Sequence, residues 1–535
     1  MEVLKESKLE HRNNNYQKSF NAEKLRRKRE EGLIQLRKQK RTLHILKKRA
    51  LQVEHSNTTQ DALNPLNEFL NFDLTWIPAN LSAVFPEILD ESISNAGRLN
   101  LLISYISTVE DLNTLFYAIQ TLRKILSNDS MPPLHFIMTS GISKKLIKLL
   151  ACDSKDLKVE CLWCILNLAT GPSHVVKELV EQGLIPLLAP LLMANENDLV
   201  ELCVWCIGNL AGDSIYNRDQ LVQLTPRLTT LIGTFNQENK KNIVWTLSNL
   251  CRGKPLPDKS ITDQILKVVP GLLHCQDESI LSDCCWALSY ISDGDNQRIQ
   301  DILDLNIIPD LINLLSNESS NVTIPCLRTL GSIVAGTESQ TQIVLNLGLV
   351  DRIPSYLSSK KVCLKREALW TLSNITAGTD EQINLVLSHP CIHQVIECLK
   401  DPDFEIKKEA LWVVSNATHA KSSNIVLKVI TLGAFGSLCD MLDQRESKIL
   451  MVALEAINNL LTAGGSSFEQ EGEGKTNEVA LKFDEIGGLS KMEDLQDHPN
   501  PKIYKRVLEI MEQHYGLEEV NDENETPVPG EFVFH

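Results

Sequence analysis

Six of the seven tryptophans in this 535-residue chain fall on a single lattice. Steps of 40 to 42 residues connect Trp163, Trp205, Trp245 and Trp286, and continue through Arg328 to Trp370, Trp412 and Leu454. Residues four apart project from the same face of a helix, so each lattice position has a partner four residues later. These partners are Asn167, Asn209, Asn249, Tyr290, Ser332, Asn374, Asn416 and Asn458.

The side chains on this lattice are suited to holding an extended peptide. An asparagine amide has both a donor and an acceptor, so a row of them binds a peptide main chain without reading its sequence. Neighbouring indoles form slots for long aliphatic stems and attract Lys or Arg, by about 0.5–2 kcal/mol each. In the alternative interpretation each tryptophan packs in the core and each asparagine braces a turn. Six repetitions favour a groove, because every buried indole and amide would need its own hydrogen-bond partner.

Carboxylates recur beside the lattice. Asp283, Glu367 and Glu409 stand three residues before a lattice tryptophan, as does Glu160. Asp213 follows the Trp205 and Asn209 pair at the expected end of a helix. These acids predict an extended ligand that is rich in lysine and arginine.

A repeat of about 42 residues is typical of armadillo or HEAT proteins, with two or three helices in each repeat. The segment "GLIPLLAPLL" begins with Gly and Pro and continues with helical spacing, and "LVELCVWCIGNLAG" reads as the next helix, ending at Gly212. Pro186, Pro226 and Pro309 recur at the start of the second helix. We therefore expect an all-α fold, a right-handed superhelical solenoid of about ten armadillo repeats with a concave face and a basic N-terminal helical arm.

Charge divides the chain into four parts. The net charge is −16, but residues 1–50 hold 16 Lys or Arg and 6 Asp or Glu, a net of +10 that leaves −26 for the remainder. We expect a basic arm over residues 1–54, a linker over 55–85, the repeat array over 86–515 and an acidic disordered tail over 516–535. The segment "AGGSSFEQEGEGKTNE" predicts a flexible insertion before the last repeat.

Several function classes are excluded by the sequence. No apolar run is long enough to span a bilayer and the N-terminus lacks a signal sequence, so a cytoplasmic or nuclear protein is expected. Fourteen cysteines should then be reduced. The pairs Cys161/Cys164 and Cys203/Cys206 are expected to be buried inside helices, since zinc needs four ligands. No phosphate loop, nucleophile elbow or histidine metal spacing occurs, so neither an enzyme nor a cofactor is expected.

Several motifs, in order along the chain, resemble the importin-α family of nuclear import adaptors. They are "RRKREEGLIQLRKQKR" in the arm, "VWCIGNLAGD", "VWTLSNLCRG", "CCWALSYISDG" and "ALWTLSNITAG" in the array, and "DEIGGLSKMEDLQDHPNPKIYKRVLEIMEQHYG" near the end. The resemblance implies an adaptor that binds basic nuclear localisation signals and links them to importin-β. The rival interpretation is an armadillo scaffold of the β-catenin kind for other partners, and a third is a regulatory subunit of an enzyme.

The resemblance also implies two signal sites. We assign to the major site Trp163, Asn167, Trp205, Asn209, Asp213, Trp245, Asn249 and Asp283. We assign to the minor site Arg328, Glu367, Trp370, Asn374, Glu409, Trp412 and Asn416. In the arm, the residues expected to bind importin-β are Arg26, Arg27, Lys28, Arg29, Arg37, Lys38, Lys40 and Arg41. Those expected to block the groove by autoinhibition are Lys47, Lys48 and Arg49.

The expected life cycle follows from the same resemblance. The chain should shuttle between cytoplasm and nucleus and return with a recycling exportin and Ran-GTP. Direct nucleic-acid binding is not expected, because the acidic body repels phosphate.

Three residues depart from the family pattern and leave the relative strength of the two sites open: Val176 replaces threonine, Leu202 replaces glutamine and Ser332 replaces asparagine. Ala50 replaces asparagine beside the autoinhibitory cluster and leaves its strength open.

Overall fold

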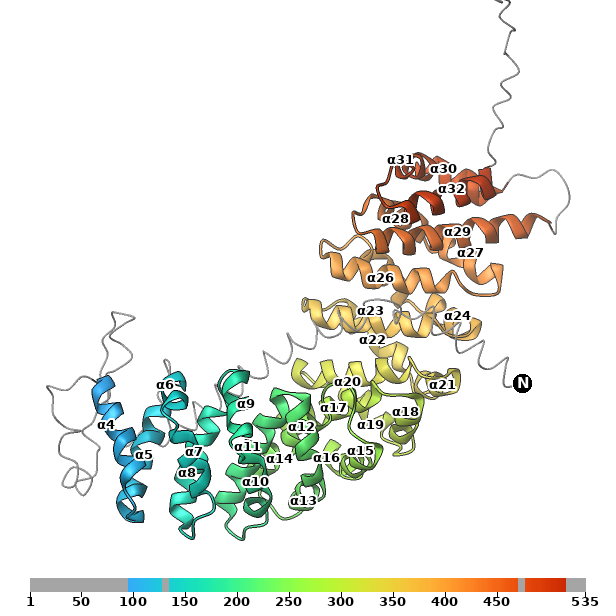
Figure 1. The fold of residues 1–535 in the computed structure, drawn as a ribbon. Coiled ribbons are helices and arrows are strands. Elements are labelled where there is room, and N and C mark those ends of the chain that lie inside the picture. The colour runs from blue at the N-terminus through green and yellow to red at the C-terminus, as the bar shows by residue number, and fades with distance from the viewer. Residues whose placement is uncertain (1–94, 128–133, 470–476, 516–535) are drawn as a thin grey trace, which may run out of the picture. The chain divides into compact units, whose positions relative to one another are not determined.

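The computed structural model describes residues 95–127, 134–469 and 477–515, and these residues form α-helices and short 3-10 helices without a β-strand (Figure 1). Contacts between Cα atoms divide them into two compact units. We call the part up to Gly336 the N-terminal unit and the part from Thr337 the C-terminal unit. The predicted all-α class is confirmed within each unit.

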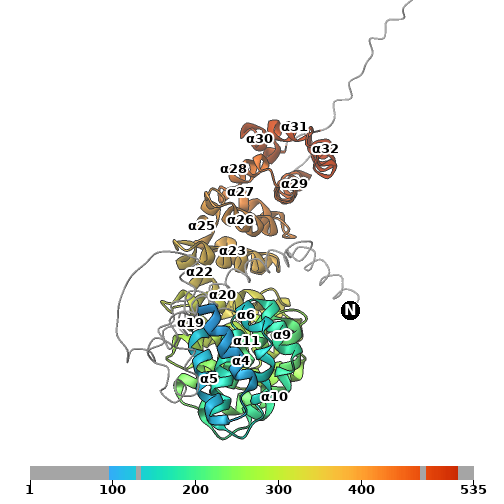
Figure 2. The same cartoon turned by 60° about the vertical axis from the view of Figure 1, so that its left-hand side comes forward.

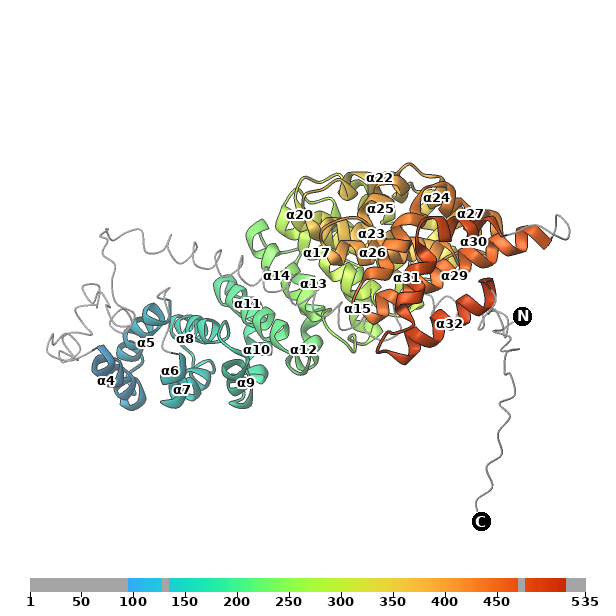
Figure 3. The same ribbon diagram turned by 90° about the horizontal axis from the view of Figure 1, so that it is seen from above.

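Each repeat ends in a long third helix, and successive third helices pack side by side. Figure 3 shows α5, α8, α11 and α14 following one another in this order, and Figure 2 shows α23, α26 and α29 doing the same. In the N-terminal unit these helices are α5 (Leu112–Leu126), α8 (Lys155–Leu168), α11 (Asn197–Asp213), α14 (Gln237–Leu250), α17 (Glu278–Ser292) and α20 (Ser320–Ile333). In the C-terminal unit they are α23 (Val362–Thr376), α26 (Phe404–Ala417), α29 (Ser447–Glu469) and α32 (Pro501–Tyr515).

Two shorter helices precede most third helices. The first helices of the N-terminal unit are α6 (Leu134–Thr139), α9 (Ser173–Glu181), α12 (Ile215–Leu221), α15 (Lys259–Leu266) and α18 (Asn296–Leu303). Its second helices are α4 (Asn95–Thr108), which leads directly into α5, and α7 (Ile142–Leu149), α10 (Leu184–Leu192), α13 (Thr225–Leu231), α16 (Val269–Leu273) and α19 (Ile308–Leu314). In the C-terminal unit the first helices are α21 (Glu338–Asn346), α24 (Asp380–Ser388), α27 (Ser423–Thr431) and α30 (Glu478–Glu485). The second helices there are α22 (Leu349–Leu357), α25 (Cys391–Cys398), α28 (Ala434–Asp440) and α31 (Gly488–Leu495).

The core lies between the third helices, and helix α11 shows why. It packs against α8 on one side and α14 on the other, while α10 covers a further face. A helix with neighbours on several sides is apolar around most of its circumference. Leu199, Cys203, Cys206 and Leu210 are accordingly all buried. The repeat of about 42 residues therefore builds a core by stacking, as predicted.

The turn between the first and second helices uses glycine in the left-handed conformation. Gly183 has a φ of 91° before α10, and Gly348 has a φ of 80° before α22. Glycine adopts this conformation without the steric cost of a Cβ. Pro226 and Pro309 stand in the first turns of α13 and α19, where the missing N–H has no helical acceptor. The prediction that proline marks the start of the second helix is confirmed.

Two predicted breaks are wrong. Helix α11 does not end at Gly212 but continues to Asp213, and Gly212 is buried in its last turn. A Cβ on Gly212 would lie 2.9 Å from the side-chain nitrogen of Asn249, so this glycine makes room for the next repeat. The "AGGSSFE" part of the predicted flexible insertion is helical, because α29 extends to Glu469. A Cβ on Gly464 would overlap Val479, so packing against α30 explains the glycine there.

All fourteen cysteines are free thiols, and Cys161, Cys164, Cys203 and Cys206 are buried in α8 and α11 as predicted. Burial raises the pKa of the Cys206 thiol to about 12. Within the described ranges, no group of three or more His, Cys, Asp or Glu is placed to hold a metal ion. In the same part of the chain no single helix has the length and apolarity to cross a bilayer, and one bent pair, Ser423–Thr431 with Ala434–Asp443, meets the length and composition test.

Candidate functional site

The tryptophan lattice lies on successive third helices, as the sequence predicts. Trp163 of α8 and Trp205 of α11 meet edge to face, with ring centroids 6.0 Å apart and planes at 85°. Trp163 is partly exposed, whereas Trp205 is only 5 % exposed. Edge-to-face geometry places the positive edge of one ring against the negative face of the other. The two indoles therefore stabilise each other and leave the Trp163 ring partly open to solvent.

Most lattice asparagines are buried, and their amides reach back to the preceding repeat. Asn249 donates from Nδ2 to the backbone oxygen of Gly208 at 2.9 Å, and Asn416 donates to that of Ser373 at 2.8 Å. Asn167 donates to Ser127 Oγ at 3.2 Å. Each of these buried amides thus has the hydrogen-bond partner that burial requires, and for Asn249 and Asn416 it is a carbonyl of the previous third helix. Asn209 differs and is partly exposed.

Trp245 is placed by a residue that the sequence did not single out. A Cβ on Gly208 would overlap the six-membered ring of Trp245, and would lie 2.7 Å from Thr246 Oγ1. The indole therefore lies directly on the backbone of α11 and remains partly exposed. A glycine one position before a lattice asparagine is the signal that would have identified it.

Asp213 is the last residue of α11 and is partly exposed. Its Oδ1 accepts a hydrogen bond from Ser173 Oγ at 2.7 Å, and its Oδ2 accepts from Asn217 Nδ2 at 3.5 Å. Ser173 stands 40 residues earlier, at the start of α9, so a neighbouring repeat orients the carboxylate. This arrangement holds an acidic group at the helix end, and no Lys or Arg within residues 95–127, 134–469 and 477–515 forms an ion pair with it.

Glu160 does not have the open position that its place before Trp163 predicts. Its carboxylate is 10 % exposed, accepts from Gln120 Nε2 at 3.3 Å and forms an ion pair with Arg123 of α5. A buried carboxylate with its own guanidinium is neutralised within the fold. The predicted role of Glu160 beside Trp163 is thus replaced by a link between α5 and α8.

Arg328 and Trp286 form a cation–π pair between α20 and α17. The Arg328 guanidinium carbon lies 5.9 Å from the centroid of Trp286, and Tyr290 stacks on the same indole at 5.7 Å. All three residues are buried, and Asp283, also buried, stands one turn earlier in α17. The structure thus brings Arg328 of α20 against α17. Cation–π contact of this kind stabilises an otherwise costly buried charge.

The remaining lattice residues of the minor set lie on α23 and α26, which pack together. Trp370 and Trp412 are partly exposed, whereas Asn374 of α23 and Asn416 of α26 are buried. Glu367 is 4 % exposed and Glu409 is fully buried. Both carboxylates are therefore buried, whereas the two indoles remain partly open to solvent.

The three departures from the family pattern are all buried. Val176 of α9, Leu202 of α11 and Ser332 of α20 are each at most 5 % exposed. Apolar side chains at two of these positions pack in the core. Neither Val176 nor Leu202 therefore supplies the polar group that threonine or glutamine would have there.

The basic residues predicted in the arm, from Arg26 to Arg49, lie outside the described residues, as do the linker over 55–85 and the tail over 516–535.

Comparison with known proteins bears on the whole chain. The importin beta binding domain matches residues 12–96. The armadillo/beta-catenin-like repeat matches residues 172–212, 258–293, 337–377 and 379–419, and an atypical Arm repeat matches 477–530. Importin subunit alpha-2 of Arabidopsis thaliana is 40 % identical over 539 residues, which cover 99 % of this chain and 96 % of that protein. The chain belongs to the importin-α family.

Two further relatives agree. Importin subunit alpha-3 of Arabidopsis thaliana is 36 % identical over 99 % of this chain and 97 % of its own length. Importin subunit alpha-B of Dictyostelium discoideum is 40 % identical over 99 % and 98 %. A crystal structure of an engineered protein matches 77 % of this chain with a TM-score of 0.68 at 21 % identity, which supports the fold alone. As an importin-α, the chain is a nuclear import adaptor with an importin-β-binding segment, and importin-α proteins are transport adaptors rather than enzymes.

Proposed function

We propose that the partly exposed lattice side chains hold lysine-rich and arginine-rich nuclear localisation signals of cargo proteins. The observation that carries this proposal is the Asp213 carboxylate, which Ser173 and Asn217 orient at the end of the helix that bears Trp205 and Asn209. A lysine ammonium that reached Asp213 would gain a charge-assisted hydrogen bond. The neighbouring indoles would enclose its aliphatic stem.

The two sets of residues act as two sites. In the major site Trp163 and Trp245 are open to a ligand, while Trp205 supports Trp163 from within the core. In the minor site Trp370 and Trp412 enclose the ligand stem, and the buried Glu367 and Glu409 make the surroundings favourable for a cation. Asn249 and Asn416 retain an amide oxygen that accepts from a peptide N–H.

The arm links cargo loading to the carrier. Residues 12–96 match an importin beta binding domain, and the arm carries +10 against −26 for the remainder. Lys47, Lys48 and Arg49 occupy the groove near Asp213 when no carrier holds the arm. Importin-β then removes the arm and opens the groove. The chain shuttles between cytoplasm and nucleus and returns with a recycling exportin and Ran-GTP.

Titration of a fluorescent peptide tests the proposal. The full-length chain, with importin-β present to hold the arm, is titrated into a single-cluster lysine-rich peptide and into a control peptide in which glutamate replaces every lysine. The proposal requires anisotropy to rise with the lysine-rich peptide alone. Preference for the glutamate peptide would instead favour a scaffold for acidic partners of the β-catenin kind.

A further inference from the structure

The net charge of the segment at the start of each third helix changes sign between the two units. We define this segment, which we call the turn, as the seven residues that lie four to ten positions before the lattice residue, so it includes the first residues of the helix. The five turns before Trp163, Trp205, Trp245, Trp286 and Arg328 contain four basic and nine acidic residues. The three turns before Trp370, Trp412 and Leu454 contain eight basic and three acidic residues. A reversal at one structural position points to a surface that selects an acidic partner.

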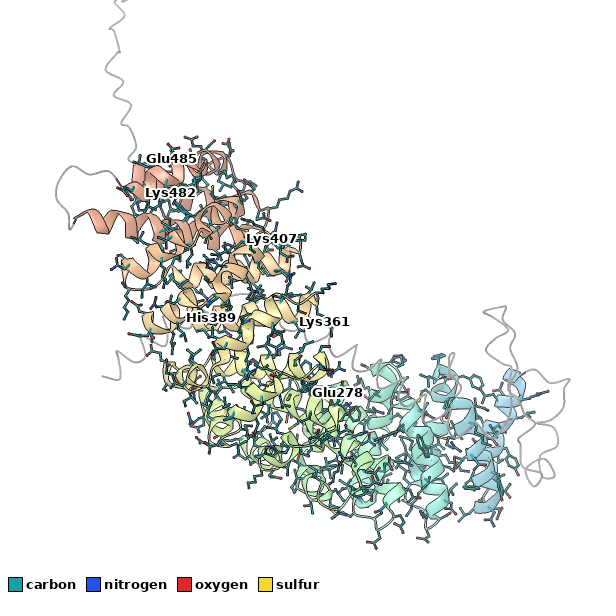
Figure 4. All side chains as sticks on the ribbon, turned by 180° about the vertical axis from the view of Figure 1, so that it is seen from behind. Glu278, Lys361, His389, Lys407, Lys482 and Glu485 are labelled. Carbon is teal, nitrogen blue, oxygen red and sulfur yellow. The ribbon has the colours of Figure 1, made fainter. Side chains whose placement is uncertain are left out.

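The strongest basic concentration lies at the starts of α23 and α26. We define it as the basic edge, and Figure 4 labels two of its residues, Lys361 and Lys407, along one edge of the C-terminal unit. The N-terminus of α23 carries no acidic residue in its first turn, and its N-cap residue, Lys361, makes no side-chain hydrogen bond to the helix. The partial positive charge of a helix N-terminus adds to these ammonium groups. The basic edge consists of Lys360, Lys361, Lys365, Arg366, Lys407 and Lys408.

The acids in these turns and directly beside them are already engaged. Lys365 pairs with Asp401 at 3.2 Å. Glu405 receives both Arg366 at 3.1 Å and Lys408 at 2.8 Å, so one carboxylate serves two cations. Asp403 caps α26 by accepting from the backbone N–H groups of Glu405 and Ile406. The three carboxylates of Asp401, Asp403 and Glu405 thus stand against six basic residues, which leaves the edge with a surplus of positive charge.

Three lysines remain for a partner. Lys360 and Lys361 are exposed and Lys407 is partly exposed. Among residues 337–469 and 477–515, no carboxylate forms an ion pair with any of them. They extend over two adjacent repeats, because α23 and α26 pack side by side. Such an array fits an extended run of carboxylates better than a single anion.

We infer that the basic edge binds an acidic segment of the same cargo chain whose basic cluster lies in the groove. This inference rests on the proposed function and extends it to the flanking sequence of the signal. Lys361 stands nine residues before Trp370, which is about 14 Å along a helix that rises 1.5 Å per residue. About four extended residues span that distance. Cargo selected by this edge therefore carries acids about four residues from its basic cluster.

Three fluorescent peptides test the inference on the full-length chain with importin-β present. All carry the same basic cluster, and they differ in four residues placed beyond a four-residue spacer: glutamates before the cluster, glutamates after it, or serines. The first variant is Lys360→Gln/Lys361→Gln/Lys407→Gln. The control variant, Lys482→Gln/Lys502→Gln/Lys505→Gln, removes three exposed lysines from the last repeat.

One glutamate peptide should bind about tenfold more tightly than the serine peptide at low salt, as expected from three exposed ion pairs. The first variant should lose this gain and keep its affinity for the serine peptide, whereas the control variant should keep both the gain and the affinity. The gain should also shrink as salt screens the charges. Equal affinity of all three peptides for the unchanged protein would overturn the inference. Failure of the serine peptide to bind at all would instead defeat the proposed groove.

A further arm separates peptide from nucleic acid. A fluorescent single-stranded oligonucleotide is titrated into the same proteins. Little binding, unaltered by the first variant, supports recognition of peptide carboxylates. Tight binding that the first variant abolishes would overturn the inference, because the edge would then recognise phosphate.

Discussion

Asn416 donates its side-chain amide to the backbone oxygen of Ser373, one repeat earlier, at 2.8 Å. The bond joins α26 to α23 in the region where we place the minor site. Asn249 makes the same bond to Gly208 in the N-terminal unit. One residue type at one repeat position thus couples neighbouring repeats in both units.

Replacement of Asn416 by alanine should destabilise the array. The Ser373 carbonyl would lose its amide donor in a buried position, at a cost of about 1–3 kcal/mol. Thermal unfolding followed by circular dichroism should show a lower midpoint. Asn209→Ala serves as the control, because Asn209 is partly exposed. Equal effects of the two replacements would contradict the bridging role.

Replacement of Gly208 by alanine should weaken peptide binding at the major site. The new methyl group overlaps the Trp245 ring, and overpacking of this kind costs about 1–3 kcal/mol. The indole must move, and the emission of Trp245 should shift. A single-cluster peptide should lose affinity, whereas Gly436→Ala should leave its affinity unchanged, since a Cβ on Gly436 meets no atom within 4 Å. Unaltered binding by the Gly208 variant would contradict the assigned position.

Replacement of Asp213 by lysine should abolish binding of a single-cluster signal peptide. The ligand ammonium would lose its carboxylate and meet a like charge, together worth several kcal/mol. Ser173→Ala should cause a smaller loss, because it releases the carboxylate without removing it. Anisotropy titration measures both. An unchanged Kd for the Asp213 variant would remove this residue from the site.

Thiol chemistry should distinguish buried from partly exposed cysteines. Burial raises the pKa of the Cys206 and Cys251 thiols to about 12 and that of Cys398 to about 11. At pH 8 iodoacetamide should therefore modify Cys152, Cys275 and Cys363, which are partly exposed, well before the eleven buried cysteines. Mass spectrometry of the digested protein identifies the modified residues. Early modification of Cys206 would contradict its place in the core.

The same pKa shifts predict alkaline sensitivity. The unfolded thiols ionise near pH 8.5, and the folded ones at about 11 to 12. Their contribution to stability is therefore fully present below about pH 8.5 and is lost as pH rises toward the folded values. The temperature of the unfolding midpoint should therefore decrease as the pH is raised from about 9 to about 11, since the unfolded thiols ionise in this range and the folded ones do not. A flat profile would show that the thiols do not contribute.

Autoinhibition is tested in the full-length chain by replacing Lys47, Lys48 and Arg49 with alanine. A tethered arm has an effective concentration in the millimolar range, so it reduces the fraction of open grooves and raises the apparent Kd. The triple variant should bind a single-cluster peptide more tightly than the unchanged chain, and the difference should shrink with salt. Identical Kd values at low salt would mean that this cluster does not occupy the groove.

The sequence by itself determined the repeat and the class of fold. Trp205 and Trp245 are forty residues apart because each third helix needs the same face toward its neighbours. Periodicity also predicted the proline positions and the burial of Cys203 and Cys206, since both depend on local spacing. The ligand class that we propose, a peptide rich in Lys and Arg, rests on the residue types of the lattice.

Tertiary structure alone decided which lattice residues face solvent. Trp163 and Trp205 are equivalent in sequence, yet the first is partly exposed and the second is covered by its neighbour. Glu160 pairs with Arg123, which belongs to another repeat. A repeat pattern specifies one unit, whereas these outcomes depend on the residues that the adjacent unit presents. Gly208 shows the reason: the absence of a side chain has meaning only once the Trp245 ring lies against it.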